Sequence, residues 1–107
     1  MSEWNLVVTT GVRAGRPSTF IVDIHDVDPN DLDPDEVFTI CNHHDEELRF
    51  AKGSWQSWLL RSFNNHNGPS MSIGDFIVAV TGAPVRQMLV LTDTGWAPGK
   101  FTVIDRT

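Results

Sequence analysis

Two stretches near the start of the chain have the pattern of hydrophobic and polar residues that is typical of β-strands. The first spans residues 5–10, and the second spans residues 19–24. In the second stretch Phe20, Val22 and Ile24 share one face, while the residues between them share the other. A turn rich in Gly, Arg and Pro separates the two stretches. The pattern predicts two strands joined by a turn.

The middle of the chain changes to the three- and four-residue spacing of helices. Pro34 can open a helical turn with Asp33 as its N-cap, because Pro suits the first helical position and Asp accepts a free amide. A longer helix is predicted between residues 45 and 63. Gly53 weakens its middle, so a start with Ser54 as N-cap is the alternative. Its apolar residues lie largely on one face: Leu48, Ala51, Trp55, Trp58, Leu59 and Phe63.

Three more apolar stretches follow, at residues 71–80, 85–92 and 101–104, and turn formers separate them. The order β-β-α-β-β-β predicts an α+β fold, in which a bent antiparallel sheet of about five strands packs on one main helix. We expect all 107 residues to form a single domain. The helix residues Trp55, Trp58, Leu59 and Phe63 are predicted to pack against Ile77, Val80, Leu89 and Val103.

Composition places the chain among ordinary globular proteins, with 40% hydrophobic and 21% charged residues. Cys41 is the only cysteine, and the chain opens with neither a basic segment nor an apolar run of signal length. No apolar run approaches the roughly 20 residues that span a bilayer. These features predict a cytoplasmic protein with no membrane segment, and they call for no cofactor.

Charge is distributed unevenly. Ten of the fourteen acids lie between Asp23 and Glu47, a stretch without Lys or Arg, so its formal charge is −10. The remaining four acids and all eight bases give +4 elsewhere, which sums to −6. A net acidic chain repels phosphate, which argues against free nucleic acid as a partner, although Arg49, Lys52 and Arg61 leave a small basic face open.

The acidic stretch permits two interpretations. It is a solvated loop, or it is an anionic surface that docks on a basic protein partner. In the second case the expected contact residues are Asp28, Asp31, Asp33, Asp35 and Glu36.

Several short motifs occur together: EVFTICN at 36–42, FN at 63–64, HN at 66–67, SMSIGDFI at 70–77 and TGW at 94–96. The combination resembles a group of small uncharacterised proteins carried by actinobacteria, their plasmids and their phages, which share a Ser-Leu/Met-Ser-Val/Ile-Gly-Asp box. This chain differs from the group before the first serine of the box, where it has Gly-Pro, and before the final Gly-Trp, where it has Thr. The resemblance implies a mobile-element accessory protein and no particular activity.

The box at residues 70–77 has a structural interpretation and a functional one. Alternation puts Ser70 and Ser72 on one side of an extended segment, and the Gly-Asp pair permits a turn before the next strand. Alternatively, Ser70, Ser72, Asp75 and His66 form a hydrogen-bonding rim for a ligand. The segment lacks the G-x-S-x-G elbow of serine hydrolases, so no catalytic residue is predicted.

Candidate metal ligands do not have the spacing of known sites. Cys41, His43, His44 and His66 follow no zinc-finger or zinc-ribbon pattern. Three acidic and amide residues from 26 to 30 match the start of a calcium loop, but the turn glycine and the closing glutamate are missing. We therefore predict that no metal is bound.

These observations favour a small phage or mobile-element accessory protein that binds a host or phage protein without catalysis. An acidic inhibitor that mimics nucleic-acid charge is one version of this hypothesis. Trp96 is expected on a loop, where an exposed ring would serve as a second contact. A ligand-binding or hydrolytic domain that uses His66 and the box is the alternative, and a structural or virion component is a third.

Overall fold

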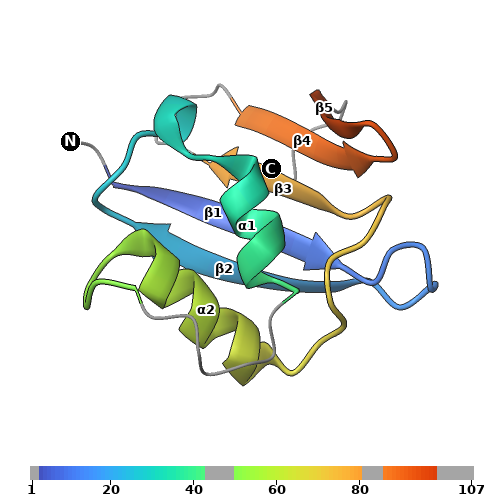
Figure 1. Cartoon of the computed structure of the whole chain (residues 1–107), viewed down its shortest axis with the longest axis horizontal. Coiled ribbons are helices and arrows are strands. Elements are labelled where there is room, and N and C mark those ends of the chain that lie inside the picture. Colours follow the sequence, from blue (N-terminus) through green and yellow to red (C-terminus); the bar gives the residue numbers. More distant parts are fainter. Residues whose placement is uncertain (1–2, 43–49, 81–85, 99–107) are drawn as a thin grey trace, which may run out of the picture.

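A five-stranded antiparallel sheet forms the framework of the protein, and both helices cover the same face of it (Figure 1). The computed structural model describes residues 3–42, 50–80 and 86–98. For residues 86 and 87 it describes only the backbone. The elements are β1 (Trp4–Thr10), β2 (Ser18–Ile24), the 3₁₀ helix η1 (Pro29–Asp31), α1 (Pro34–Ile40), α2 (Trp55–His66), β3 (Phe76–Val80), β4 (Arg86–Thr92) and β5 (Gly95–Pro98). The predicted α+β fold is confirmed.

The strands lie in the order β2-β1-β3-β4-β5. The first strand of the chain is therefore an inner strand, paired with β2 on one side and β3 on the other. In this register Val8 stands opposite Phe20 of β2 and Ile77 of β3. Because alternate residues of a strand face the same way, these three side chains lie together on the face that the helices cover.

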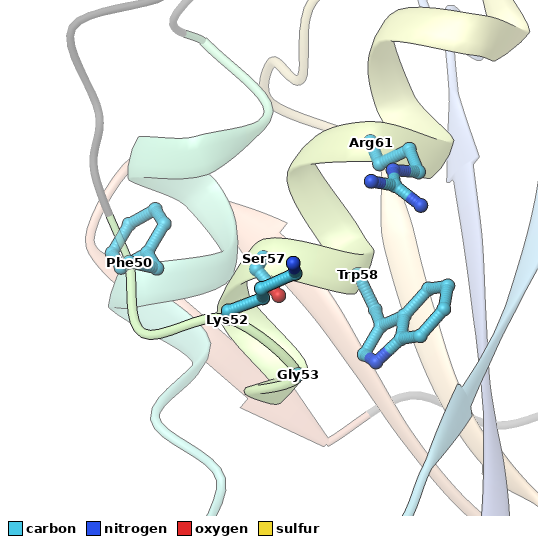
Figure 2. Close-up of a pocket in the computed structure, with 6 residues that line it drawn as sticks. All are labelled: Phe50, Lys52, Gly53, Ser57, Trp58 and Arg61. Atoms are coloured by element: carbon cyan, nitrogen blue, oxygen red, sulfur yellow. The ribbon is translucent and has the colours of Figure 1, made fainter.

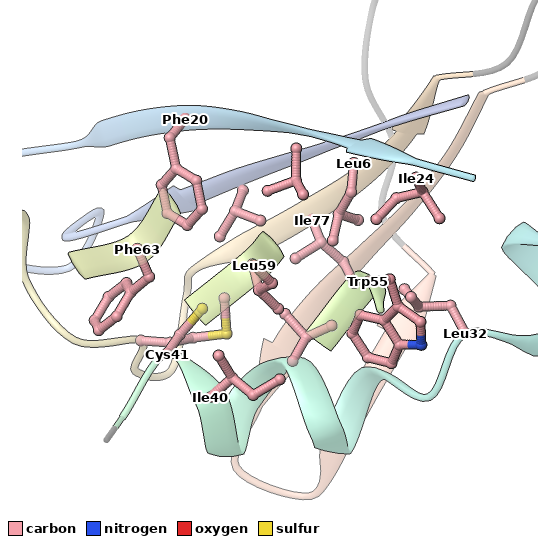
Figure 3. Packing of buried hydrophobic residues seen from close by; sticks show 14 of the residues in the cluster. Leu6, Phe20, Ile24, Leu32, Ile40, Cys41, Trp55, Leu59, Phe63 and Ile77 are labelled. Atoms are coloured by element: carbon pink, nitrogen blue, oxygen red, sulfur yellow. The ribbon is translucent and has the colours of Figure 1, made fainter. Parts of the chain in front are cut away.

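The core lies between this face and the helices (Figure 3). Alternate residues of β2 are buried, as its apolar alternation predicts, whereas β1 buries Thr9 and Thr10 as well as alternate apolar residues. α1 adds Val37 and Ile40, which makes it a second packing helix and not just a turn. α2 adds Trp55, Leu59 and Phe63, three of the four helix residues expected in the core. Full burial of a side chain of this size contributes about 1.5–3 kcal/mol to stability.

Both helices begin where capping chemistry predicts. The Asp33 side chain accepts a hydrogen bond from the Asp35 amide at 3.0 Å, and Pro34 opens α1. The Ser54 hydroxyl accepts one from the Ser57 amide at 3.3 Å, so the start after Ser54 is confirmed for α2. α2 ends at Asn67, whose φ of 55° is the left-handed cap that Asn tolerates.

Trp58 is 45% exposed, and the prediction that it packs in the core was wrong. α2 contacts β2 and α1 through Trp55, Leu59 and Phe63, which form a narrow stripe along the helix. With 3.6 residues per turn, Trp58 lies about 100° from the centre of that stripe. Three-residue spacing alone does not distinguish the centre of an apolar face from its margin.

The strand expected from residue 71 begins only at Phe76, because residues 72–75 form a turn. Gly74 adopts a φ of 97°, which lies outside the extended region and favours glycine. The expected strand at residues 101–104, which contains Val103, lies outside the described residues. Residues 43–49 lie outside them as well.

Candidate functional site

The Asp75 side chain is fully buried and is bound by the protein itself. One carboxylate oxygen accepts a hydrogen bond from the Val12 amide at 3.0 Å, and the other accepts one from the Ser72 amide at 2.8 Å. Its backbone carbonyl also accepts a bond from the Leu91 amide at 2.9 Å. Asp75 therefore does not lie on an accessible rim, and it joins the turn at 72–75 to two other parts of the sheet.

The other residues of the box differ in their burial and contacts. Met71 is 2% exposed and packs in the core, and its amide donates to the Cys41 carbonyl. Ile73 is 42% exposed, so it does not share a side with Met71 as the alternation predicted. The reason is the turn, since strand alternation ends where the backbone reverses. Ser72 is exposed beside Ile73, and Ser70 is half-buried.

His66, at the end of α2, is held against β2. Its Nε2 atom forms a short hydrogen bond with the Ser18 hydroxyl. Its ring lies 5.0 Å from the Phe20 ring, measured between centroids. A methyl group on Gly68 would come within 2.7 Å of the imidazole, so the chain packs closely here. These contacts give His66 a structural role in anchoring the end of α2 to the sheet.

Cys41 lies in the core at the end of α1. Burial, and to a lesser degree the negative charge of Asp75, raises the pKa of its thiol to about 12. A thiol with so high a pKa stays protonated and unreactive at neutral pH. The described residues contain no group of three or more His, Cys, Asp or Glu that could hold a metal ion. His43 and His44 are not described.

The acidic stretch runs from the end of β2 into α1. Seven of its ten carboxylates lie in the described residues, and all seven are exposed: Asp23, Asp26, Asp28, Asp31, Asp33, Asp35 and Glu36. Two of these make structural hydrogen bonds, Asp33 to the start of α1 and Asp26 to the Trp55 amide at 3.1 Å. The only ion pair among the described residues joins His25 to Glu3, so no Lys or Arg neutralises this surface within the described part.

Five of these carboxylates lie along η1 and the first turn of α1: Asp28, Asp31, Asp33, Asp35 and Glu36. We call them the acidic surface. Three buried side chains fix the backbone beneath it, Leu32, Val37 and Ile40. Phe38 of α1 is 38% exposed and lies three residues after Asp35, on the same side of the helix. The acidic surface thus has a fixed backbone and an exposed apolar side chain beside it.

Trp96 does not lie on a loop. It stands in β5 opposite Leu91 and packs against the core. Its indole Nε1 is buried and has no hydrogen-bond partner in the described part of the chain. The ring is half-buried, so the expectation of an exposed contact at Trp96 was wrong.

A pocket of about 460 Å³ lies along the exposed flank of α2 (Figure 2). It is lined by Phe50, Lys52, Gly53, Ser57, Trp58 and Arg61. The basic face suggested by the sequence is thus present in part, because Lys52 and Arg61 line one cavity, while Arg49 is not described. Sequence reasoning missed the pocket because it assigned Trp58 to the core.

Comparison with known proteins gave no match to a family profile, to a curated protein or to a solved structure. The likeness to small actinobacterial proteins therefore stays a prediction. Within the described ranges, neither helix has the length and apolar character needed to cross a membrane.

Proposed function

We propose that the protein acts by non-catalytic binding, and that its acidic surface docks on a basic face of a protein partner. The chain carries a net charge of −6, and its described Lys and Arg residues lie outside the acidic surface. Carboxylates clustered in this way attract a cationic surface over several ångströms and accelerate its association.

The anchoring of the acidic surface is the observation that carries this proposal. A charged loop that serves only to be solvated has no need of a fixed backbone. Here Leu32 is 9% exposed, Val37 0% and Ile40 1%, so η1 and α1 are held against the core. A rigid backbone loses little conformational entropy when a partner binds, which favours affinity.

The exposed ring of Phe38 supports the same use of the surface. It follows two carboxylates of the first turn of α1, Asp35 and Glu36. Protein contacts combine buried aromatic side chains, from which water is excluded, with polar and charged residues at the rim. We expect Phe38 to contribute mainly to the affinity for the partner, and the carboxylates to increase the rate of association.

The test is a triple charge reversal, Asp28→Lys, Asp31→Lys and Glu36→Lys, compared with Phe38→Ala. Asp33 is left unchanged because it caps α1, and losing that cap costs about 1 kcal/mol. Immobilised wild-type protein and each variant are exposed to lysate at low and high salt, and retained proteins are quantified by mass spectrometry.

The matched control reverses three exposed acids elsewhere, Glu3, Asp23 and Asp93, and changes the net charge by the same amount. A basic protein that is retained by the wild type and the control, lost with the reversal variant, and displaced by added heparin supports the proposal. The purified partner should then associate more slowly with the reversal variant. Equal retention by the two triple variants would mean that only net charge matters, and the acidic surface would have no specific role.

A further inference from the structure

The pocket on α2 combines an exposed indole with two cationic side chains, those of Lys52 and Arg61. Trp58 and Arg61 are three residues apart and share a helix flank, and the Arg61 guanidinium carbon lies 5.4 Å from the Trp58 ring centroid. Lys52 enters from the segment before α2, and Phe50 stands on the other side of the cavity (Figure 2). Neither Lys52 nor Arg61 forms an ion pair with a described residue.

Each part of this lining suits a different part of one ligand. An exposed indole offers a flat face on which a planar aromatic ring can stack. Lys and Arg bind phosphate or carboxylate through charge-assisted hydrogen bonds. The Ser57 hydroxyl donates its proton to the Ser54 carbonyl at 2.8 Å, so its lone pairs can accept a bond from a ligand hydroxyl. A volume of about 460 Å³ falls in the range of small-molecule pockets.

The start of α2 does not supply the anion site. The Trp55 amide donates to Asp26, and the Ser57 amide donates to the Ser54 hydroxyl. Two amides of the first turn are therefore already engaged within the protein, and an anion in this pocket depends on the Lys52 and Arg61 side chains.

We infer that this pocket binds a mononucleotide, whose base stacks on Trp58 and whose phosphate is held by Lys52 and Arg61. Its sugar hydroxyls lie within the reach of Ser57. The net charge of −6 repels a polyanionic strand more strongly than a mononucleotide, which carries about two negative charges. The binding contacts include no residue of the acidic surface, so the inference does not depend on the proposed function.

Calorimetric titration at low salt tests the inference with a panel of probes. The panel holds the nucleoside 5′-monophosphates, the matching nucleosides, inorganic phosphate and a single-stranded oligonucleotide. We expect the monophosphates to bind at least about tenfold more tightly than either the nucleosides or phosphate, because only they engage both the ring and the cations. Fluorescence should be quenched on binding, since Trp58 is the exposed one of the four tryptophans, while Trp4 and Trp55 are buried and Trp96 is half-buried.

Three single substitutions separate the contributions. Trp58→Ala should weaken monophosphate binding about tenfold, because it removes the stacking surface. Lys52→Gln and Arg61→Gln should each weaken it about five- to tenfold and flatten its salt dependence. Arg13→Gln with Arg16→Gln is the control, since these exposed arginines lie in the loop between β1 and β2, outside the pocket lining. That control should leave affinity within about twofold.

Four results would overturn the inference. The first is the lack of monophosphate binding at millimolar concentration, and the second is binding that Trp58→Ala leaves unchanged. The third is inorganic phosphate binding as tightly as the monophosphates, which would show a plain anion site. The fourth is an oligonucleotide binding more tightly than the monophosphates, which would point to a strand as the ligand. Circular dichroism of Trp58→Ala confirms that a loss of binding does not reflect unfolding, as expected for a residue that is 45% exposed.

Discussion

Removing the carboxylate of Asp75 tests the structural interpretation of the box most directly. In Asp75→Ala the amides of Val12 and Ser72 lose their acceptor. Asp75→Asn keeps the shape of the side chain but places an NH₂ group against one of these two donors. The two substitutions therefore separate the loss of both hydrogen bonds from the loss of one.

The expected magnitude follows from these bonds. A hydrogen bond to a charged group contributes about 1.5–3 kcal/mol, and two of them are lost in Asp75→Ala. Val12 is exposed, so its amide can bind water after the substitution, which brings the estimate toward the lower end. We expect Asp75→Ala to destabilise by about 3 kcal/mol and Asp75→Asn by about half as much. Against a typical total of about 5–15 kcal/mol, the first value is a large share.

Urea titration measures both changes, with Asp93→Ala as a control at an exposed carboxylate in the β4–β5 turn. The control should change stability by less than about 0.5 kcal/mol. Native-state hydrogen exchange adds a local readout, because the Val12 and Ser72 amides should lose protection before the rest of the sheet does. A loss below about 1 kcal/mol in Asp75→Ala, or unchanged protection of both amides, would refute the reasoning.

Three further predictions concern packing, pH and backbone. Trp55→Ala should cost about 3–5 kcal/mol in a urea titration and Trp58→Ala less than about 1, because their rings are 5% and 45% exposed; similar losses would contradict this core assignment. Burial raises the pKa of the Cys41 thiol to about 12 in the folded protein, against 9.0 for an exposed thiol, so its contribution to stability is complete below pH 9 and is lost as pH rises toward 12, by up to about 1.4 kcal/mol per pH unit. Cys41→Ala should remove that part of the alkaline loss, and parallel stability curves for variant and wild type would disprove it. Gly11→Ala should destabilise more than Gly15→Ala, since a Cβ at Gly11 meets the Arg16 carbonyl oxygen at 2.4 Å and a Cβ at Gly15 meets nothing within 4 Å; equal melting temperatures would speak against this.

The elements that the sequence predicted correctly depend on short-range rules. β2 follows from its apolar alternation and β1 from its strand-forming residues and the turn after it, while the cap Asp33 and the alternative cap Ser54 mark the helix starts. Each of these signals is complete within a few neighbouring residues. No knowledge of the distant chain is needed to interpret them.

The errors arose where a distant contact decides the local structure. Residues 71–75 have the alternation of a strand, but the Asp75 side chain binds Val12, sixty-three positions earlier, and the turn is fixed there. Trp58 has helical spacing suited to the core, yet its place on the margin depends on how α2 lies against β2. Trp96 was assigned to a loop because Pro and Gly follow it, whereas pairing with Leu91 places it in a strand.

The acidic surface and the pocket on α2 were likewise predictable from the sequence only in part. The charges of the acidic surface are visible in the sequence, and the helical turn after Asp33 was expected, but the fixed backbone depends on burial of Leu32, Val37 and Ile40. The basic residues beside α2 were noted as a face. A pocket there required an exposed Trp58, and burial cannot be deduced from spacing alone.

The position of β1 inside the sheet also determines how the chain reaches its fold. β1 meets β2 across a short turn, but Thr9 meets Phe76 only after the chain has passed through both helices. Closing a loop about eight times longer costs roughly 2 kcal/mol more in chain entropy. Pairing of β1 with β3 is therefore expected to be the slow step of folding, as distant strand contacts generally are.

Asp75 stands where the two halves of the sheet meet. Its side chain holds Val12, which follows β1, and its backbone holds Leu91 of β4. If these bonds form in the transition state, Asp75→Asn should slow refolding as well as lower stability. Stopped-flow refolding at the wild-type rate, with faster unfolding alone, would show instead that the strands join first. In the first case a carboxylate outside every helix and strand would help to set the order in which the sheet assembles.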